Sequence, residues 1–240
     1  MKIIHWNCQG AFRKKKETID FFNADILVIS ECENPDRLKF GKLIPEANDH
    51  FWYGDSEHKG IGVFCYGDYK IEASPTLNPA FRYVIPLLIS NATEQFHLFA
   101  IWAMDDKKDR KSSYIGQVWK ALSYYKSILC GPCILIGDFN SNQVWDKQSR
   151  VGNHTDVVNK LAEYSITSLY HDRLQEPHGE ETQPTFYLHR NKDKPYHMDY
   201  CFVSKPLIKD GYNFSVGSFE DWISLSDHCP LFIELIGKDL

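Results

Sequence analysis

Short runs of β-branched, aliphatic and aromatic residues, separated by polar segments, recur along the whole chain. Their length and composition are typical of β-strands. The clearest predicted strands span residues 2–7, 25–30, 60–67, 82–89, 95–102, 133–138, 198–204 and 229–235. Three weaker candidates span residues 69–73, 185–188 and 213–217.

Helical periodicity, with apolar residues at three- and four-residue steps, is rarer. One amphipathic segment carries Ile115, Val118, Trp119, Leu122, Tyr125 and Leu129 on one face. Ser112 or Ser113 can cap its start, and Gly131-Pro132 should end it. Two shorter helices are predicted at about residues 155–164 and 16–22.

This balance of elements predicts an α/β fold of two mixed β-sheets packed face to face, with helices outside. The alternative, a doubly wound parallel sheet, needs a helix after nearly every strand, and residues 51–102 offer none. The chain has 240 residues and no Gly/Ser-rich or Pro-rich linker. We therefore expect residues 1–240 to form a single domain.

Composition and charge limit the expected cellular location and the class of binding partner. The N-terminus has no signal-peptide pattern, and no apolar run approaches the ~18 residues of a membrane span. We expect a cytoplasmic monomer that does not contact a membrane. A net charge of -5 argues against a long basic groove for nucleic acid. It does not exclude a nuclease, because a bound cation would offset clustered carboxylates.

Polar side chains recur where the predicted strands end. Asn7 closes the first strand, Glu31 follows the second, and Asp138 closes the strand at 133–138. The others are Asn140, Asp199 in the strand at 198–204, and the pair Asp227-His228 before the last strand. Burying an unpaired carboxylate is costly, so such groups are poor core material. Converging at one edge, they would suit a hard cation and proton transfer.

These residue types predict specific roles. Glu31 with Asn7 or Asp227 would suffice for Mg²⁺, which takes few carboxylates and keeps several waters. Asp138 could orient and deprotonate a water molecule, with Asn140 fixing that carboxylate or the phosphate. A protonated His228, held by Asp199, could donate to a phosphoryl oxygen. The pattern therefore predicts metal-assisted attack of water on a phosphate ester.

The ordered set of these motifs resembles the endonuclease/exonuclease/phosphatase superfamily over nearly the whole chain. The motifs are Asn7, Glu31, Gly137-Asp138-Phe139-Asn140, Thr185-Phe186-Tyr187, Met198-Asp199-Tyr200 and Ser226-Asp227-His228. The resemblance implies a four-layer αββα sandwich and phosphate-ester cleavage that depends on Mg²⁺, or on Mn²⁺. It places Asn7, Glu31 and Asp227 at the metal, and Asp138, Asn140, Asp199 and His228 in catalysis.

Within the superfamily, the opening Asn7-Cys8-Gln9-Gly10 with Arg13 is similar to that of bacterial exonucleases and abasic-site endonucleases. So is Phe186 followed by Tyr196, where those enzymes place aromatic rings against the nucleotide. The resemblance implies a DNA substrate contacted by Arg13, Phe186, Tyr196 and Trp102.

Two departures keep a second substrate class open. Trp102 stands where DNA-cleaving relatives carry Tyr or His, and an indole can only donate one hydrogen bond. Cys32 and Glu33 follow Glu31, where the nucleases usually offer Thr and a basic residue. The alternative is a phosphatase or phosphodiesterase acting on a small or lipid phosphate ester. DNA versus RNA, endo- versus exonucleolytic cleavage, abasic-site preference and the number of metal ions stay open.

Each motif alone has an ordinary structural interpretation, such as a turn, a strand end or a solvated charge; their joint order favours function. Two other classes share some of these features: a non-catalytic binding protein with the fold that the resemblance implies, and a thiol oxidoreductase. The dithiol sequence Cys130-Gly131-Pro132-Cys133 follows a predicted helix and enters a strand. The helix dipole there has the wrong sign to lower a thiol pKa. We therefore interpret it as a helix stop.

Overall fold

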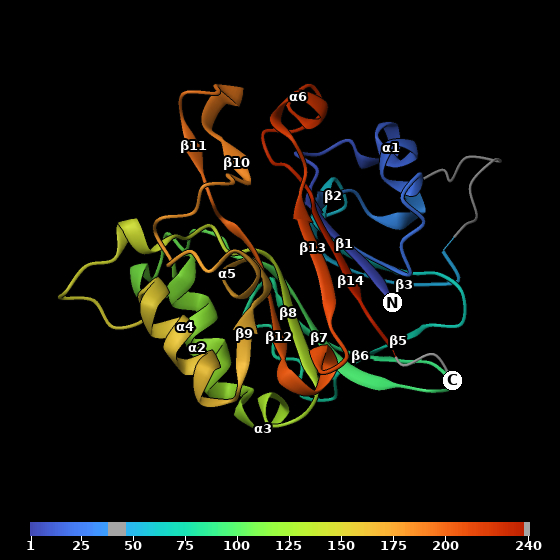
Figure 1. Ribbon diagram of the computed structural model, residues 1–240, viewed down its shortest axis with the longest axis horizontal. Helices are drawn as coiled ribbons and strands as arrows, with labels where there is room; N and C mark the ends of the chain where they lie inside the picture. The colour runs from blue at the N-terminus through green and yellow to red at the C-terminus, as the bar shows by residue number, and fades with distance from the viewer. Residues whose placement is uncertain (38–46, 238–240) are drawn as a thin grey trace.

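The computed structural model describes residues 1–37 and 47–237 and contains two six-stranded mixed β-sheets packed face to face (Figure 1). Sheet A has the spatial order β13 (Tyr212–Val216), β14 (Leu231–Leu235), β1 (Lys2–Asn7), β2 (Ile26–Cys32), β4 (Lys59–Cys65) and β3 (Asp49–Ser56). Sheet B has the order β5 (Lys70–Ala73), β6 (Val84–Ser90), β7 (Gln95–Trp102), β8 (Cys133–Asp138), β12 (Asp199–Ser204) and β9 (Ile166–Ser168). A small hairpin pairs β10 (Phe186–Tyr187) with β11 (Pro195–Tyr196).

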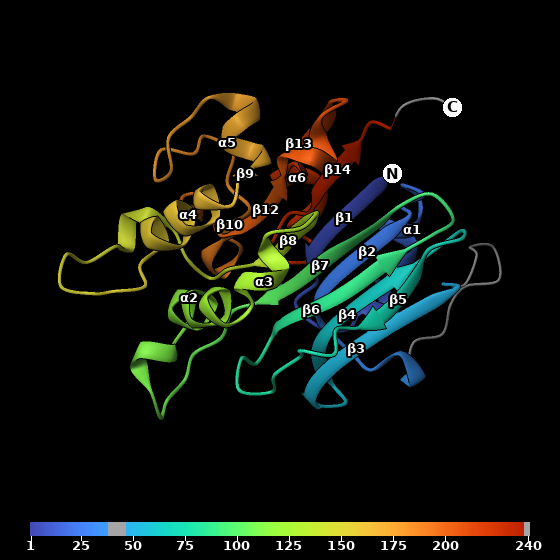
Figure 2. The ribbon, with the colours of Figure 1, turned by 90° about the horizontal axis from the view of Figure 1, so that it is seen from below.

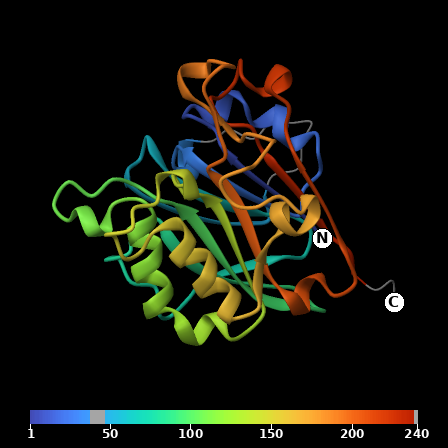
Figure 3. The ribbon, with the colours of Figure 1, turned by 60° about the vertical axis from the view of Figure 1, so that its left-hand side comes forward.

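Helices cover the outer faces of both sheets (Figures 1 and 2). The α-helices are α1 (Lys16–Asp20), α2 (Ile115–Tyr124), α3 (Lys126–Leu129), α4 (His154–Glu163), α5 (Leu169–Leu174) and α6 (Phe219–Trp222). Short 3-10 helices are η1 (Phe12–Lys14), η2 (Pro35–Arg37), η3 (Arg110–Ser112), η4 (Gln143–Trp145), η5 (Leu188–Arg190) and η6 (Lys205–Ile208). Helices α2 and α4 lie side by side against sheet B, whereas α1 and α6 lie on the side of sheet A (Figure 3). The predicted four-layer αββα sandwich is confirmed.

The two-residue period of the strands creates separate apolar layers. In β2, Ile26 and Val28 face the core between the sheets, while Leu27 and Ile29 face the layer that covers sheet A. All four are buried, so this strand reads as a continuous apolar run. A third apolar layer joins sheet B to α2, α3 and α4.

Strand direction brings the polar strand ends together. β1 runs parallel to β2, and β7 runs parallel to β8, so these four strands end on one side of the sandwich. β12 is antiparallel to β8 and begins there, with Asp199 opposite Asp138. The hairpin β10–β11 and helix α6 stand over this end (Figure 1).

Gly137 allows the close approach of β7 and β8 next to Asp138. Its φ of 153° is one that side chains rarely adopt, and a Cβ there would lie 1.8 Å from the Ile101 carbonyl oxygen. The glycine of the Gly137-Asp138 motif is therefore a packing requirement of the sheet.

Three predicted strands, β1, β7 and β8, have the observed bounds, and the helix at 155–164 corresponds to α4. The long helix prediction was wrong in detail, because the chain breaks at Tyr125 into α2 and α3. Ser113 does not cap it: its hydroxyl donates to the Asp106 carbonyl and accepts from the Asp106 N–H, both at 3.1 Å. Strands β3, β9 and β11 and helices α5 and α6 were not predicted.

Among the described residues, no helix combines the length and the apolar character that crossing a bilayer requires.

Candidate active site

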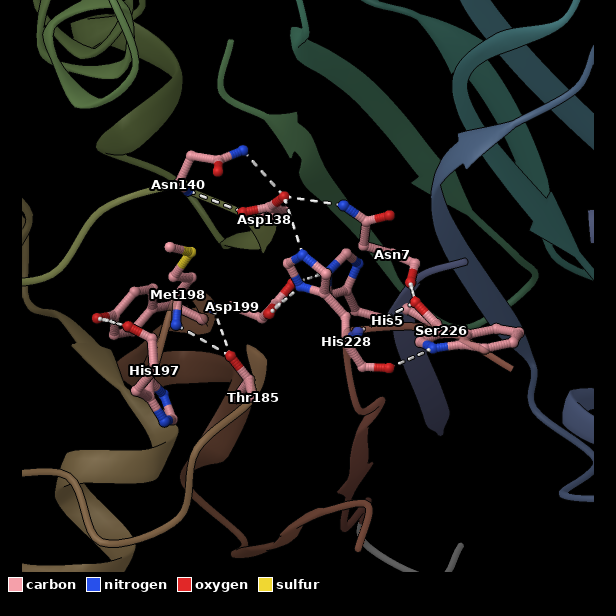
Figure 4. Close-up of polar contacts among 12 residues, drawn as sticks. His5, Asn7, Asp138, Asn140, Thr185, His197, Met198, Asp199, Ser226 and His228 are labelled. Atoms are coloured by element: carbon pink, nitrogen blue, oxygen red, sulfur yellow. Dashed lines mark hydrogen bonds and ion pairs between the residues drawn. The ribbon is translucent and has the colours of Figure 1, made fainter. Parts of the chain in front are cut away.

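Asp138 is the centre of a buried polar cluster at the end of β8 (Figure 4). Asn7 Nδ2 donates to Asp138 Oδ2 at 3.0 Å. Asn140 donates twice, from its backbone N to Oδ1 at 2.8 Å and from Nδ2 to Oδ2 at 3.0 Å. Asn140 has a φ of 46°, a left-handed conformation that asparagine tolerates. Three donors therefore fix the Asp138 carboxylate in one orientation.

Burial raises the pKa of Asp138 to about 7. The nearby His228 charge opposes this rise, and the Asp199 carboxylate adds to it. A carboxyl group whose pKa lies near neutrality is suited to accept a proton at physiological pH.

His228 lies between two carboxylates. Its Nδ1 is 2.8 Å from Asp199 Oδ2, and its Nε2 is 3.9 Å from Asp138 Oδ2. Burial alone would lower the pKa of His228, but Asp199 and then Asp138 outweigh it and raise the pKa to about 10. Burial would likewise raise the pKa of Asp199, yet His228 and His5 hold it well below its usual range. The imidazolium and the Asp199 carboxylate therefore stabilise each other's charged forms.

His5 is a member of this cluster that the sequence analysis missed. It is fully buried in β1; its Nε2 is 2.9 Å from Asp199 Oδ1, and its Nδ1 is 3.0 Å from the Val28 carbonyl oxygen. Each of its two ring nitrogens therefore has a buried oxygen within hydrogen-bond distance. The available signal was a histidine that interrupts the apolar residues Ile3, Ile4 and Trp6 of this strand.

Hydroxyl and indole groups hold the backbone of these residues. Ser226 Oγ donates to the Asn7 carbonyl at 2.7 Å and accepts from the His228 N–H at 3.1 Å. Trp6 Nε1 donates to the His228 carbonyl at 2.9 Å. On the other side, Thr185 Oγ1 accepts from the Asp199 N–H at 3.0 Å. The motif residues around the acids and the histidine thus have positioning contacts of their own.

Glu31 and Asp227 form the second acidic part of the site. Glu31 lies at a β-bulge in β2 with a φ of 62°, and such bulges redirect a side chain. Its Oε2 is 2.7 Å from Lys59 Nζ. Asp227 Oδ2 accepts from Gln9 Nε2 at 2.7 Å. Burial raises the pKa of Asp227, and the Glu31 charge contributes to that rise, so the two carboxylates repel each other. Hard oxygen donors that repel in this way fit a divalent cation such as Mg²⁺.

Asp138, Asp199 and His228 also have potential ligand atoms within 4.8 Å of one another. A hydrogen bond already occupies the facing atoms of His228 and Asp199, and Asp199 is fully buried. These three side chains therefore form one charged set, distinct from the pair Glu31 and Asp227.

Aromatic rings extend from His228 towards the surface. The Phe186 ring centroid is 4.7 Å from that of His228, and Tyr196 pairs with Phe186 across the hairpin. Tyr196 in turn packs at 5.2 Å against Trp145, whose side chain is 43% exposed. We call Phe186, Tyr196 and Trp145 the aromatic strip. Trp145 was not predicted; its only signal is its position a few residues after Asn140.

The other two predicted substrate residues lie differently. Trp102 is 4% exposed and packs against Tyr83 at 4.7 Å, so its ring offers little surface to a substrate. Lys59 Nζ lies 5.8 Å from the centroid of the Trp102 ring, so Trp102 contacts the lysine that pairs with Glu31. Arg13 is in η1 and forms an ion pair with Glu33.

The dithiol sequence has no features of a redox centre. Cys130 follows the C-terminal end of α3, and burial raises the pKa of Cys133 to about 12. Dithiol chemistry needs a lowered thiol pKa. The helix-stop interpretation agrees with this geometry.

Comparison with known proteins places the fold. No protein-family model and no curated protein matches the chain by sequence. The solved endonuclease domain of TRAS1, a telomere-specific non-LTR retrotransposon, is 15% identical, with a TM-score of 0.64 and 99% of each chain covered. The 3' phosphatase NExo from Neisseria, bound to a product DNA hairpin, is 16% identical, with a TM-score of 0.68 and coverage of 99% of this chain and 100% of that chain. Truncated TDP2 from Caenorhabditis elegans is 14% identical, with a TM-score of 0.68 and coverage of 98% and 97%. The chain therefore has the endonuclease/exonuclease/phosphatase fold.

Proposed function

We propose that this chain is a Mg²⁺-dependent phosphoesterase that hydrolyses phosphodiester bonds in DNA by attack of water. The observation that carries this proposal is the buried Asp138–His228–Asp199 set beside the carboxylates of Glu31 and Asp227. Structures of nucleases and of a 3' phosphatase share the fold over nearly their full length, which supports it.

Glu31 and Asp227, with Asn7 Oδ1, would hold Mg²⁺ or, as the alternative ion, Mn²⁺. When bound, such an ion polarises a phosphoryl oxygen and neutralises charge as it develops. Asn7 serves both parts of the site, because its Nδ2 donates to Asp138 while its Oδ1 accepts the Gln9 N–H at 3.1 Å. This amide therefore links the metal donors to the base.

Asp138 accepts a proton from the attacking water as the water oxygen bonds to phosphorus. The P–O bond to the leaving DNA oxygen breaks, and that oxygen takes up a proton from solvent. Asn7 and Asn140 keep its carboxylate fixed, so little reorganisation is needed as the proton moves. The raised pKa of about 7 keeps the ionised form available while making the carboxylate a stronger base than an exposed aspartate.

His228 donates from Nε2 towards a phosphoryl oxygen as negative charge builds. Its other nitrogen is held by Asp199, so the Nε2–H direction is fixed. The raised pKa keeps the ring cationic at neutral pH, and a cationic donor in a buried site stabilises such charge strongly.

The aromatic strip favours a nucleic acid over a small phosphate ester. Bases stack on exposed aromatic rings without sequence preference, at about 1–3 kcal/mol per base. Phe186 contacts His228, and Trp145 lies further out, so a strand could continue beyond the phosphate being cleaved.

A substrate panel tests this assignment. Labelled single-stranded and duplex DNA and soluble phosphomonoesters are incubated with one enzyme preparation and Mg²⁺. We expect DNA to be cleaved, and Trp145→Ala to raise KM for DNA about 5-fold or more from lost stacking. Phe21→Ala is the matched control, since Phe21 is 79% exposed at the end of α1. Hydrolysis of phosphomonoesters with intact DNA would overturn the substrate assignment and favour the small-ester alternative.

A further inference from the structure

A second cluster of metal-binding side chains lies beside sheet B, apart from the Asp138 cluster. It consists of His154, His171, His178, Glu181 and His197, and we call it the histidine cluster. His154 begins α4, His171 is in α5, and His178 and Glu181 lie in the segment that follows α5. His197 precedes β12, and its ring points away from His228 (Figure 4).

Three of these residues present ligand atoms to one another. One atom each of His171, His178 and Glu181 lies within 4.8 Å of the other two. His171 Nε2 is 3.2 Å from Glu181 Oε1, and these side chains are only 10% and 3% exposed. A tetrahedral zinc site has bonds of about 2.0–2.2 Å and therefore neighbouring ligand atoms about 3.3–3.6 Å apart.

Each of the three has its other polar atom held by a separate partner. His171 Nδ1 is 2.7 Å from Ser168 Oγ, and His178 Nδ1 is 3.1 Å from His154 Nε2. Glu181 Oε2 accepts from Asn142 Nδ2 at 2.9 Å. Metal ligands in proteins are usually oriented in this way by contacts through the atom that does not bind the ion.

Two buried nitrogens of the cluster have no partner within residues 1–37 and 47–237. They are His154 Nδ1 and His197 Nε2, and the two residues are 0% and 3% exposed. The His197 ring lies 6.2 Å from that of His171, and the His154 ring 5.1 Å from that of His178. A buried polar atom without a partner is costly and calls for an explanation such as a missing ion or water.

The ligand types favour one class of ion. Two imidazoles with one carboxylate suit Zn²⁺ and related transition metals better than Mg²⁺, which prefers oxygen ligands.

We propose that the histidine cluster is a zinc site, with His171 Nε2, His178 Nε2 and Glu181 Oε1 as ligands and water in the fourth position. The His171 and His178 rings stack at 3.4 Å between centroids, so the two imidazoles already lie against each other. The bound water would offer a partner to an unpaired imidazole nitrogen. The ion would fix α5 and the segment after it against sheet B.

The site is tested by zinc binding to the full chain. The protein is stripped with a chelator and titrated with ZnCl₂ against a chromophoric chelator, with thermal unfolding as a second readout. We expect one tightly bound equivalent and a raised Tm in the wild type. His178→Gln and Glu181→Gln should weaken this binding at least about 100-fold, and Ser168→Ala about 10–100-fold.

Two control variants separate this site from others. Glu31→Gln should still bind one zinc ion tightly, because Glu31 lies beside the Asp138 cluster and not in the histidine cluster. His58→Gln removes an exposed histidine outside both clusters and should bind zinc as tightly as the wild type. Equal binding by His178→Gln and the wild type, or loss only in Glu31→Gln, would overturn the proposal. Should His178→Gln fail to fold, Co²⁺ added to the wild type decides: tetrahedral visible bands support the site, and their absence overturns it.

Discussion

His228 and Asp199 are joined by a 2.8 Å hydrogen bond between Nδ1 and Oδ2, and both side chains are buried. This bond leaves Nε2 of His228 facing Asp138 and the place where a phosphate would lie. A single contact therefore sets both the charge and the direction of the proposed proton donor.

Replacing His228 tests this contact. Among the described residues, His228→Ala leaves the buried Asp199 carboxylate with His5 as its one side-chain partner, and breaking a buried ion pair costs about 3–5 kcal/mol. We expect that loss in the free energy of unfolding by chemical denaturation, while the control His58→Ala changes it by less than about 0.5 kcal/mol. His228 has a raised pKa, so its contribution is fully present below about pH 6.5 and is lost as pH rises through about 10. A deficit that is unchanged between pH 7 and pH 11 would contradict the ion-pair account.

The pH dependence of kcat/KM follows from the same groups. Asp138 must be ionised to accept a proton, so activity should rise with pH through a pKa no higher than about 7, since a bound cation would lower that value. It should fall only as His228 loses its proton near pH 10. The two limbs report macroscopic values of the coupled cluster. A profile that already falls between pH 7 and pH 8 would show that His228 is not the cationic donor.

His5 should act as a positioning residue. His5→Gln removes the contact with either Asp199 Oδ1 or the Val28 carbonyl, leaving a buried acceptor unsatisfied at about 1–3 kcal/mol. We expect kcat to fall by about 10- to 100-fold with little change in KM, because Asp199 is displaced rather than the substrate. Steady-state kinetics on DNA measure both constants. Unchanged kcat in a folded variant would show that His5 has no part in the site.

Gly137→Ala should displace Asp138, the proposed base, although the added methyl group does not contact the Asp138 carboxylate. The added methyl group meets the Ile101 carbonyl, and overpacking costs about 1–3 kcal/mol. We expect a lower Tm together with reduced activity, because β8 must move next to Asp138. Gly131→Ala is the control, since its Cβ would meet nothing nearer than 3.7 Å. Equal melting temperatures for the two variants would contradict this account of the glycine.

Strand bounds could be predicted from the sequence where the local apolar pattern matches the strand pairing in the sheets. β8 is apolar up to Gly137-Asp138, and β7 is apolar except for Gln95 and His97, so their bounds could be predicted. β3 was missed because it lies at the edge of sheet A and its residues are only partly buried, without a clear alternation. The break at Tyr125 depends on tertiary contacts, because the Tyr125 hydroxyl accepts the Asn78 N–H at 3.0 Å.

Some residues of the candidate site could be predicted from local motifs, and others could not. Asp138 and His228 stand in short motifs at strand ends, and their convergence follows from strand direction. His5 and Trp145 have no motif, and their roles depend on pairings across the fold that no local pattern encodes. The histidine cluster draws on segments from α4 to β12, and its proposed ligands His171 and His178 stand further apart than the His-x₃₋₅-His spacing typical of zinc sites.

The most direct test of the central claim is Mg²⁺-dependent hydrolysis of end-labelled DNA by the wild type and by Asp138→Asn. The account predicts cleavage with Mg²⁺, none in EDTA, recovery when Mg²⁺ is restored, and a loss of about 100- to 10,000-fold in a folded Asp138→Asn variant. Cleavage that persists in EDTA, or an Asp138→Asn variant as active as the wild type, would contradict it.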